Sequence, residues 1–116
     1  MKAYKVHETM QYFVSRLPVK LNGVHVVYSD AFIRAQAHAD GLRDVGRFVG
    51  YCDKPNRTIY LTARVLKMSK QYDDMVTDLI AHEVAHLVVA DHGAAFQTIY
   101  HQLMPLKTPV DMLLME

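Results

Sequence analysis

Two histidines four residues apart carry the clearest chemical signal in the sequence. His82 is followed directly by Glu83, and His86 completes the pattern His-Glu-x-x-His. On a helix, residues four apart lie one turn above each other on the same side, so both imidazoles can bind one metal ion. Zinc suits such a pair, and Glu83 is expected to act as the general base on a water held by the ion. The spacing therefore predicts a hydrolytic centre with one Zn²⁺.

A third histidine can complete the zinc site. His92 follows His86 by six residues, and a catalytic zinc site needs three protein ligands with one position left for water. If the helix continued, those six residues would carry His92 about 9 Å further along and away from the ligand side. The helix must therefore end near Val89 or Ala90, so that the chain can bend back. We predict that His92 is the third ligand, with Asp91 as the weaker candidate.

These histidines need a helix to position them, and the strongest helical pattern covers residues 72–89. Two aspartates stand in its first turn, where the helix dipole favours negative charge. Its apolar stripe is formed by Val76, Leu79, Ile80, Val84 and Leu87. A second helix is expected between Gly93 and Pro105. Its apolar positions are Phe96, Ile99, Tyr100 and Leu103.

The elements before this helix are expected to form a small sheet with one helix in front. Apolar residues at spacings of three and four predict an amphipathic helix over residues 2–17. A β-branched, aromatic run predicts a strand over 24–28, and 31–46 is interpreted as a helical turn followed by an irregular loop. Residues 47–52 and 58–62 predict a hairpin, because turn residues separate them. The fold class is therefore α+β, with a small, mostly antiparallel sheet.

Length and charge limit the classes of function. A chain of 116 residues is expected to form one domain, residues 1–116. Thirteen basic against twelve acidic residues give a formal net charge of +1, which argues against a protein that mainly coats nucleic acid. Nucleic acid is thus not indicated by the net charge. The basic residues that could still touch it are Arg43, Arg47, Lys54 and Arg57.

Cysteine content and hydropathy point to an intracellular protein. Cys52 is the one cysteine, so an internal disulfide is excluded and a thiolate-bound structural zinc is disfavoured. No apolar run approaches the about 20 residues that cross a membrane. The first residues lack the apolar core and cleavage site of a signal peptide. We therefore expect a cytoplasmic location and no membrane contact.

The active-site segment resembles a known family. His-Glu-Val-Ala-His, then Leu-Val-Val-Ala-Asp, then His-Gly-Ala-Ala-Phe at residues 92–96 is similar to the minimal zincin metallopeptidases of the SprT-like and WLM (Wss1-like) type. The five-residue spacer looks like the WLM and YgjP-like branch. Gly50-Tyr51 and residues 58–62 look like the strand pair that precedes the helix in that family. The resemblance covers roughly residues 47–105.

The resemblance implies a zinc-dependent metallopeptidase with a minimal zincin-like fold. Its zinc ligands would be His82, His86 and His92, and Glu83 would be the general base for hydrolysis of a protein or peptide substrate. Within the strand pair, residues 59–62 could offer a backbone edge to an extended peptide. On the second helix, Tyr100 and His101 are candidates for stabilising the oxyanion, each with packing or surface exposure as the commoner role.

Two other functions remain open from the sequence. The pattern also resembles that of YbeY-type endoribonucleases, including the Asp91-His92 pair, but those proteins lack a glutamate where this chain has Glu83. The spacing of the histidines occurs in metzincins too, which have a glycine at the position of Val89. Finally, the chain could be a non-catalytic module that zinc stabilises.

Overall fold

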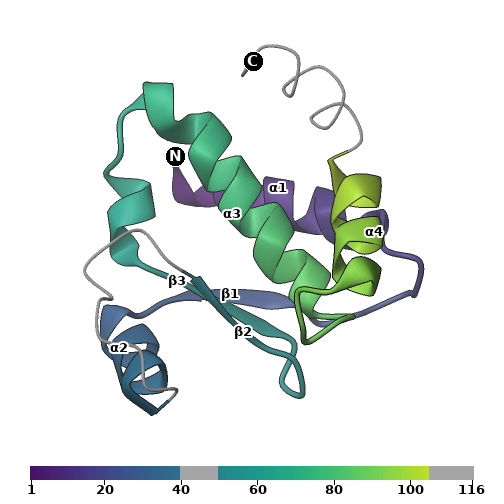
Figure 1. Cartoon of the computed structure of the whole chain (residues 1–116). Coiled ribbons are helices and arrows are strands. Elements are labelled where there is room, and N and C mark those ends of the chain that lie inside the picture. The colour runs from purple at the N-terminus through teal and green to yellow at the C-terminus, as the bar shows by residue number, and fades with distance from the viewer. Residues whose placement is uncertain (40–49, 105–116) are drawn as a thin grey trace, which may run out of the picture.

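The computed structural model describes residues 1–39 and 50–104. Within these residues, a three-stranded sheet has helices on both sides (Figure 1). Helices α1 (Ala3–Ser15) and α3 (Asp73–His86) lie on one face of the sheet, and α2 (Asp30–Ala39) lies on the other. Helix α4 (Ala94–Leu103) packs beside the C-terminal end of α3. The described residues include no helix that is both long enough and apolar enough to cross a membrane.

The sheet has the order β1-β3-β2, with β3 in the middle. β3 (Thr58–Leu61) pairs antiparallel with β2 (Gly50–Asp53) and parallel with β1 (His25–Tyr28). The expected hairpin is therefore present, but the expectation of a mostly antiparallel sheet does not hold for the pair of β1 and β3. The chain leaves β1 through α2 and returns to pair in the same direction, as a parallel pair requires a crossover.

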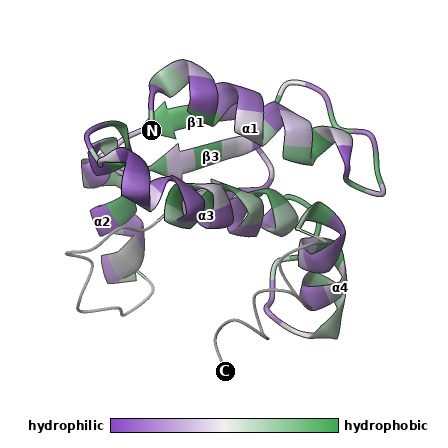
Figure 2. Cartoon of the chain, turned by 90° about the horizontal axis from the view of Figure 1, so that it is seen from above, coloured by the Kyte–Doolittle hydropathy of each residue, from purple (hydrophilic) through white to green (hydrophobic). Residues whose placement is uncertain are grey.

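The core lies between the sheet and the helices α1 and α3. On β3, Ile59 and Leu61 are fully buried and face these helices, whereas Tyr60 points to the other face. Figure 2 shows the apolar and polar residues alternating along α1 and α3. Side chains from α1, β3, α3 and α4 close one continuous core, whose most buried members include Val6, Met10, Ile59, Leu61, Val76, Ile80, Val84 and Leu103. The expected α+β class and its N-terminal helix are confirmed.

Helix α2 differs from the expected helical turn. Ser29 caps the N-terminus of α2, because its hydroxyl accepts a hydrogen bond from the backbone N–H of Phe32 at 3.2 Å. Two side chains then hold the helix to the sheet. Ile33 is buried, and the ring of Phe32 stacks on that of Tyr60 with the centroids 3.8 Å apart. The helix therefore continues to Ala39, and the rest of the predicted loop lies outside the described residues.

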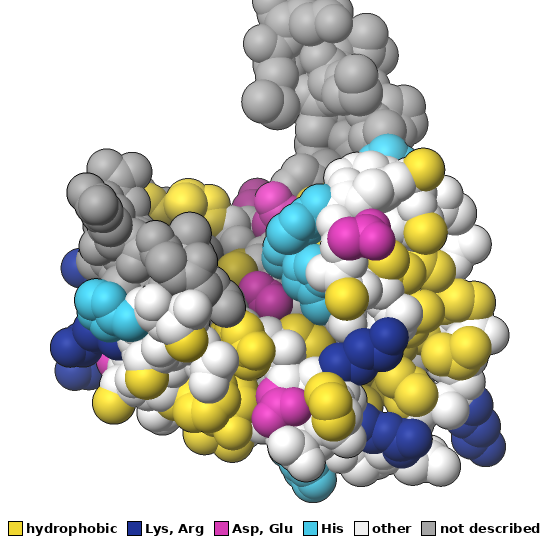
Figure 3. Space-filling model, turned by 60° about the horizontal axis from the view of Figure 1, so that its bottom comes forward, with side chains coloured by type: hydrophobic (Ala, Val, Ile, Leu, Met, Phe, Trp, Pro, Cys, Tyr) yellow, Lys and Arg dark blue, Asp and Glu magenta, His cyan; other side chains and the backbone are white. Residues whose placement is uncertain are grey.

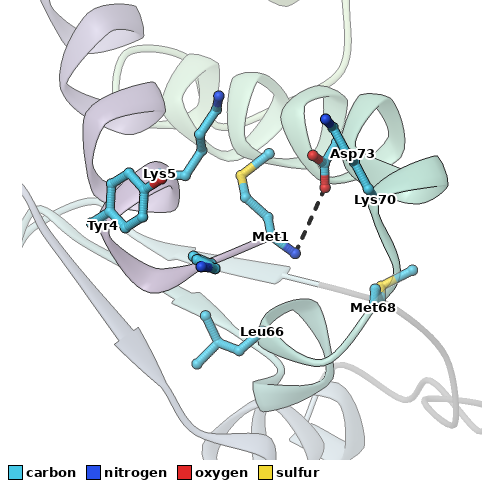
Figure 4. Close-up of a pocket in the computed structure, with 8 residues that line it drawn as sticks. Met1, Tyr4, Lys5, Leu66, Met68, Lys70 and Asp73 are labelled. Carbon is cyan, nitrogen blue, oxygen red and sulfur yellow. Dashed lines mark ion pairs between the residues drawn. The ribbon is translucent and has the colours of Figure 1, made fainter.

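Two short 3-10 helices, Ala63–Leu66 and Lys70–Tyr72, connect β3 to α3. Beside them, a pocket of about 460 Å³ opens at the N-terminal end of α3 (Figure 4). There the Met1 ammonium group lies 3.7 Å from a carboxylate oxygen of Asp73. The histidines of the predicted zinc site stand in the last turns of α3 and in the loop that follows it. The pocket is thus separate from the predicted site.

Candidate metal centre

The three predicted ligands converge on one point. Their Nε2 atoms form a triangle in which His82 and His86 are 3.2 Å apart, His86 and His92 are 3.0 Å apart, and His92 and His82 are 3.2 Å apart. Three nitrogens that share one tetrahedral zinc ion at about 2.0–2.1 Å would stand about 3.3 Å from each other. Among the described residues, these histidines form the group that could hold a metal ion, and the donor set fits zinc.

The protonation of the rings suits metal binding. The Nδ1 of His86 lies 2.9 Å from the carbonyl oxygen of Val89, so Nδ1 carries the hydrogen and Nε2 keeps its lone pair. Burial, with smaller contributions from the neighbouring rings of His86 and His92, lowers the pKa of His82 to about 4. Burial also lowers the pKa of His86. Both rings are therefore neutral at pH 7, which is the form that binds a metal.

A phenylalanine ring lies against all three histidines. The centroid of Phe96 is 5.0 Å from that of His82, 4.7 Å from that of His86 and 5.1 Å from that of His92. Phe96 stands in the first turn of α4 and is 2% exposed. His92 by contrast is exposed. The centre thus has an apolar wall formed by Phe96 and an open side next to His92, on a face where histidine side chains gather beside a depression (Figure 3).

The loop after α3 returns His92 to the other ligands. α3 ends at His86, earlier than the predicted end near Val89. The carboxylate of Asp91 accepts a hydrogen bond from the backbone N–H of Gly93 at 2.9 Å, so Asp91 shapes the turn that carries His92. Lys54, in the turn between β2 and β3, donates a hydrogen bond to the carbonyl oxygen of Val88 at 3.2 Å. Asp91, the weaker candidate ligand, is not among the residues that converge.

Glu83 is buried next to the histidines, against strand β2. It is 5% exposed, and burial raises the pKa of its carboxyl to about 8. No group within the described part of the chain is hydrogen-bonded to that carboxyl. A carboxyl group whose pKa lies near neutral pH can both accept and release a proton. The predicted general base is therefore in an environment that suits acid–base chemistry.

The candidates for stabilising an oxyanion lie on α4. The Tyr100 hydroxyl donates a hydrogen bond to the carboxylate of Asp78, one turn before His82 on α3. His101 is exposed, and its ring contacts that of Tyr100. In this structure the hydroxyl of Tyr100 links α4 to α3.

The sheet order shows that the prediction of a substrate edge at residues 59–62 is wrong. Residues 59–62 lie mainly in β3, which is hydrogen-bonded on both sides and has no free edge. β2 is the strand that lies beside Glu83, and it pairs with β3 alone among the described strands. Two of the predicted basic residues, Arg43 and Arg47, lie outside the described residues.

Sequence reasoning missed the contact of Phe96 with the ligands and the link between Tyr100 and Asp78. The sequence places Phe96 on the apolar side of its helix, and its spacing from His92 gives no signal of contact, because His92 precedes the helix. Asp78 stands four residues before His82, on the same side of α3. That spacing was a usable signal for a residue next to the site.

Comparison with known families gives one further finding. The family model described as "YgjP-like, metallopeptidase domain" matches residues 6–113, which include every residue of the candidate metal centre. The match confirms the resemblance to the SprT-like and YgjP-like metallopeptidases. The comparisons with curated proteins and with solved structures give no match.

Proposed function

The chain belongs to the YgjP-like metallopeptidase family, and on this premise we propose that it is a zinc-dependent peptidase. Its substrate would be a protein or peptide. The observation that carries the proposal is the triangle of histidine Nε2 atoms, 3.0–3.2 Å apart. Three imidazoles suit zinc, and three protein ligands are the number found in catalytic zinc sites.

His82, His86 and His92 would hold the ion. When bound there, zinc acts as a Lewis acid and makes water a nucleophile near neutral pH. Glu83 then takes the proton of the attacking water on its carboxylate and passes it to the amine that leaves. Glu83 is 5% exposed, and this burial keeps bulk water away from the transferred proton.

Strand β2 is the proposed place for the substrate backbone. An extended peptide can add to a free strand edge by main-chain hydrogen bonds, which do not depend on its sequence. β2 lies beside Glu83, so a peptide paired with β2 would pass close to the general base and to the histidines. This proposal replaces the edge of residues 59–62.

The test compares Glu83→Gln with wild type, both loaded with zinc. Glu83→Gln is expected to keep one zinc per chain and to lose at least about 100-fold in peptide hydrolysis, because the amide cannot accept the proton. The matched control is Glu8→Gln, the same change at an exposed position on α1, which should keep full activity. His92→Ala should lower zinc content, measured by elemental analysis.

Four results would contradict the proposal. Full activity of Glu83→Gln would exclude Glu83 as the general base. Unchanged zinc content of His92→Ala would exclude His92 as a ligand. If zinc-loaded wild type cleaved single-stranded RNA and no peptide, the chain would be a ribonuclease. If zinc raised the melting temperature without turnover of either substrate, the chain would be a zinc-stabilised binding module.

A further inference from the structure

Gly50, the first residue of β2, lies directly against the side chain of Glu83. A Cβ atom built on Gly50 would stand 2.9 Å from Cγ of Glu83, 3.2 Å from Cδ and 3.0 Å from Oε2. These are three successive atoms of one side chain, so turning the carboxylate alone would not remove the overlap. Any side chain at position 50 would therefore displace Glu83 as a whole.

Glu83 has little room to move elsewhere. It is 5% exposed and stands on α3 beside Val84, which is fully buried. Its backbone is part of α3, three residues before the helix ends at His86. A shift of the Glu83 side chain away from β2 would change its position relative to His82, the next residue on α3.

The backbone does not explain the glycine at position 50. Among the described glycines, Gly23 is the one with a positive φ, at 70°, whereas Gly50 has an ordinary strand conformation. Glycine in a strand is unfavourable relative to alanine, because it loses more conformational freedom on folding. The space that Glu83 occupies is the feature that requires glycine at this position.

We propose that Gly50 is a positioning residue for Glu83: the absence of a side chain on β2 provides the seat in which the carboxyl of Glu83 is held. The catalytic consequence rests on the proposed function, whereas the packing consequence does not. If the seat is real, the effect of a methyl group at position 50 must depend on whether a glutamate is present at position 83.

The experiment measures Gly50→Ala in two backgrounds, wild type and Glu83→Ala, by thermal denaturation with a chelator present. In the wild-type background, Gly50→Ala is expected to lower Tm by several degrees because its methyl group overlaps Glu83. In the Glu83→Ala background it should raise Tm, because the space is free and alanine suits a strand better. Gly23→Ala is the matched control, since nothing lies within 4 Å of its added Cβ and its cost comes from φ alone. It should lower Tm equally in both backgrounds.

Activity gives the second readout. Zinc-loaded Gly50→Ala should keep its zinc content and a KM within a few-fold of wild type, while kcat falls by about 10–100-fold, as a displaced catalytic group predicts. Folded Gly23→Ala should keep its kcat. An equal Tm change for Gly50→Ala in both backgrounds, or an unchanged kcat, would overturn the proposal. If Gly50→Ala alone fails to fold, the double variant must be the more stable of the two, and the reverse result also overturns it. A wild-type chain without peptidase activity would refute the proposed function and leave the Tm comparison as the test of the seat.

Discussion

Replacing Phe96 by leucine should weaken zinc binding more than it weakens the fold. The Phe96 ring contacts all three histidine rings, at centroid distances of 4.7–5.1 Å. Leucine keeps an apolar side chain at this position, which is 2% exposed, but it removes the aromatic ring with which the imidazoles make edge and tilted contacts. The histidines would then have to be ordered by the metal itself.

The magnitude follows from the three contacts. An aromatic pair is worth about 0.5–1.5 kcal/mol beyond the burial of its area. Such contacts are not additive, so the loss of three is expected to cost about 1.5–3 kcal/mol in the arrangement that would bind zinc. Since about 1.4 kcal/mol corresponds to a tenfold change in affinity, the zinc Kd should rise about 10–100-fold. Removal of partners that orient metal ligands changes affinity by a similar factor.

Zinc affinity is measured by competition with a chromophoric chelator, and stability by thermal denaturation in EDTA. The control is Leu103→Val, on the same helix about 10 Å further along, which is also 2% exposed. It should cost about 1 kcal/mol of stability and leave the zinc Kd unchanged. A wild-type Kd for Phe96→Leu would refute the role of the ring. An equal rise in Kd for Leu103→Val would mean that general loss of stability, not ring contact, weakens the site.

Two further predictions test residues near the centre. Burial, with a smaller contribution from the charge of Glu83, raises the pKa of Cys52 to about 12. At pH 8 the thiol of the native protein should therefore react with a disulfide reagent at least about 100-fold more slowly than the thiol of protein unfolded in guanidinium. Equal reaction rates, followed by absorbance, would contradict this prediction. Tyr100→Phe should lower stability by about 1 kcal/mol, because the hydroxyl donates to Asp78, and should keep peptide hydrolysis within a few-fold. A loss of kcat above 100-fold at normal zinc content would show instead that the Tyr100 hydroxyl acts on the substrate.

The candidate site could be predicted from the sequence because its parts are local. His82 and His86 are related by one helical turn, and the periodicity of the apolar residues around them defines that helix. His92 lies in the same short segment, so a single bend had to place it, and the structure brings its Nε2 within 3.2 Å of the other two. Helix α1 was predictable for the same reason, with Ala3–Ser15 inside the predicted range 2–17.

Helix α2 shows why local patterns fail elsewhere. Ala35 and Ala39 give little apolar signal, so the sequence predicts only a helical turn followed by a loop over 31–46. What holds the helix is the stacking of Phe32 on Tyr60, and these residues are 28 positions apart. A contact at that separation has no signature in the hydrophobic periodicity, because periodicity reports which face of an element is buried and not which partner buries it.

The sheet order also depends on a contact between residues far apart in the sequence, and it decides which strand edge is free. The hairpin of β2 and β3 follows from its turn residues, but the parallel pairing of β1 with β3 joins Val26 to Ile59 and leaves no trace in either strand alone. Because β1 pairs with one edge of β3 and β2 with the other, β3 cannot receive a peptide. The strand that lies next to Glu83 is β2. From the sequence, Gly50 was one residue of a strand pair. With β2 placed against α3, the same residue lies in contact with the side chain of Glu83, the proposed general base. That contact gives a reason why the strand begins with glycine, a residue that fits strands poorly.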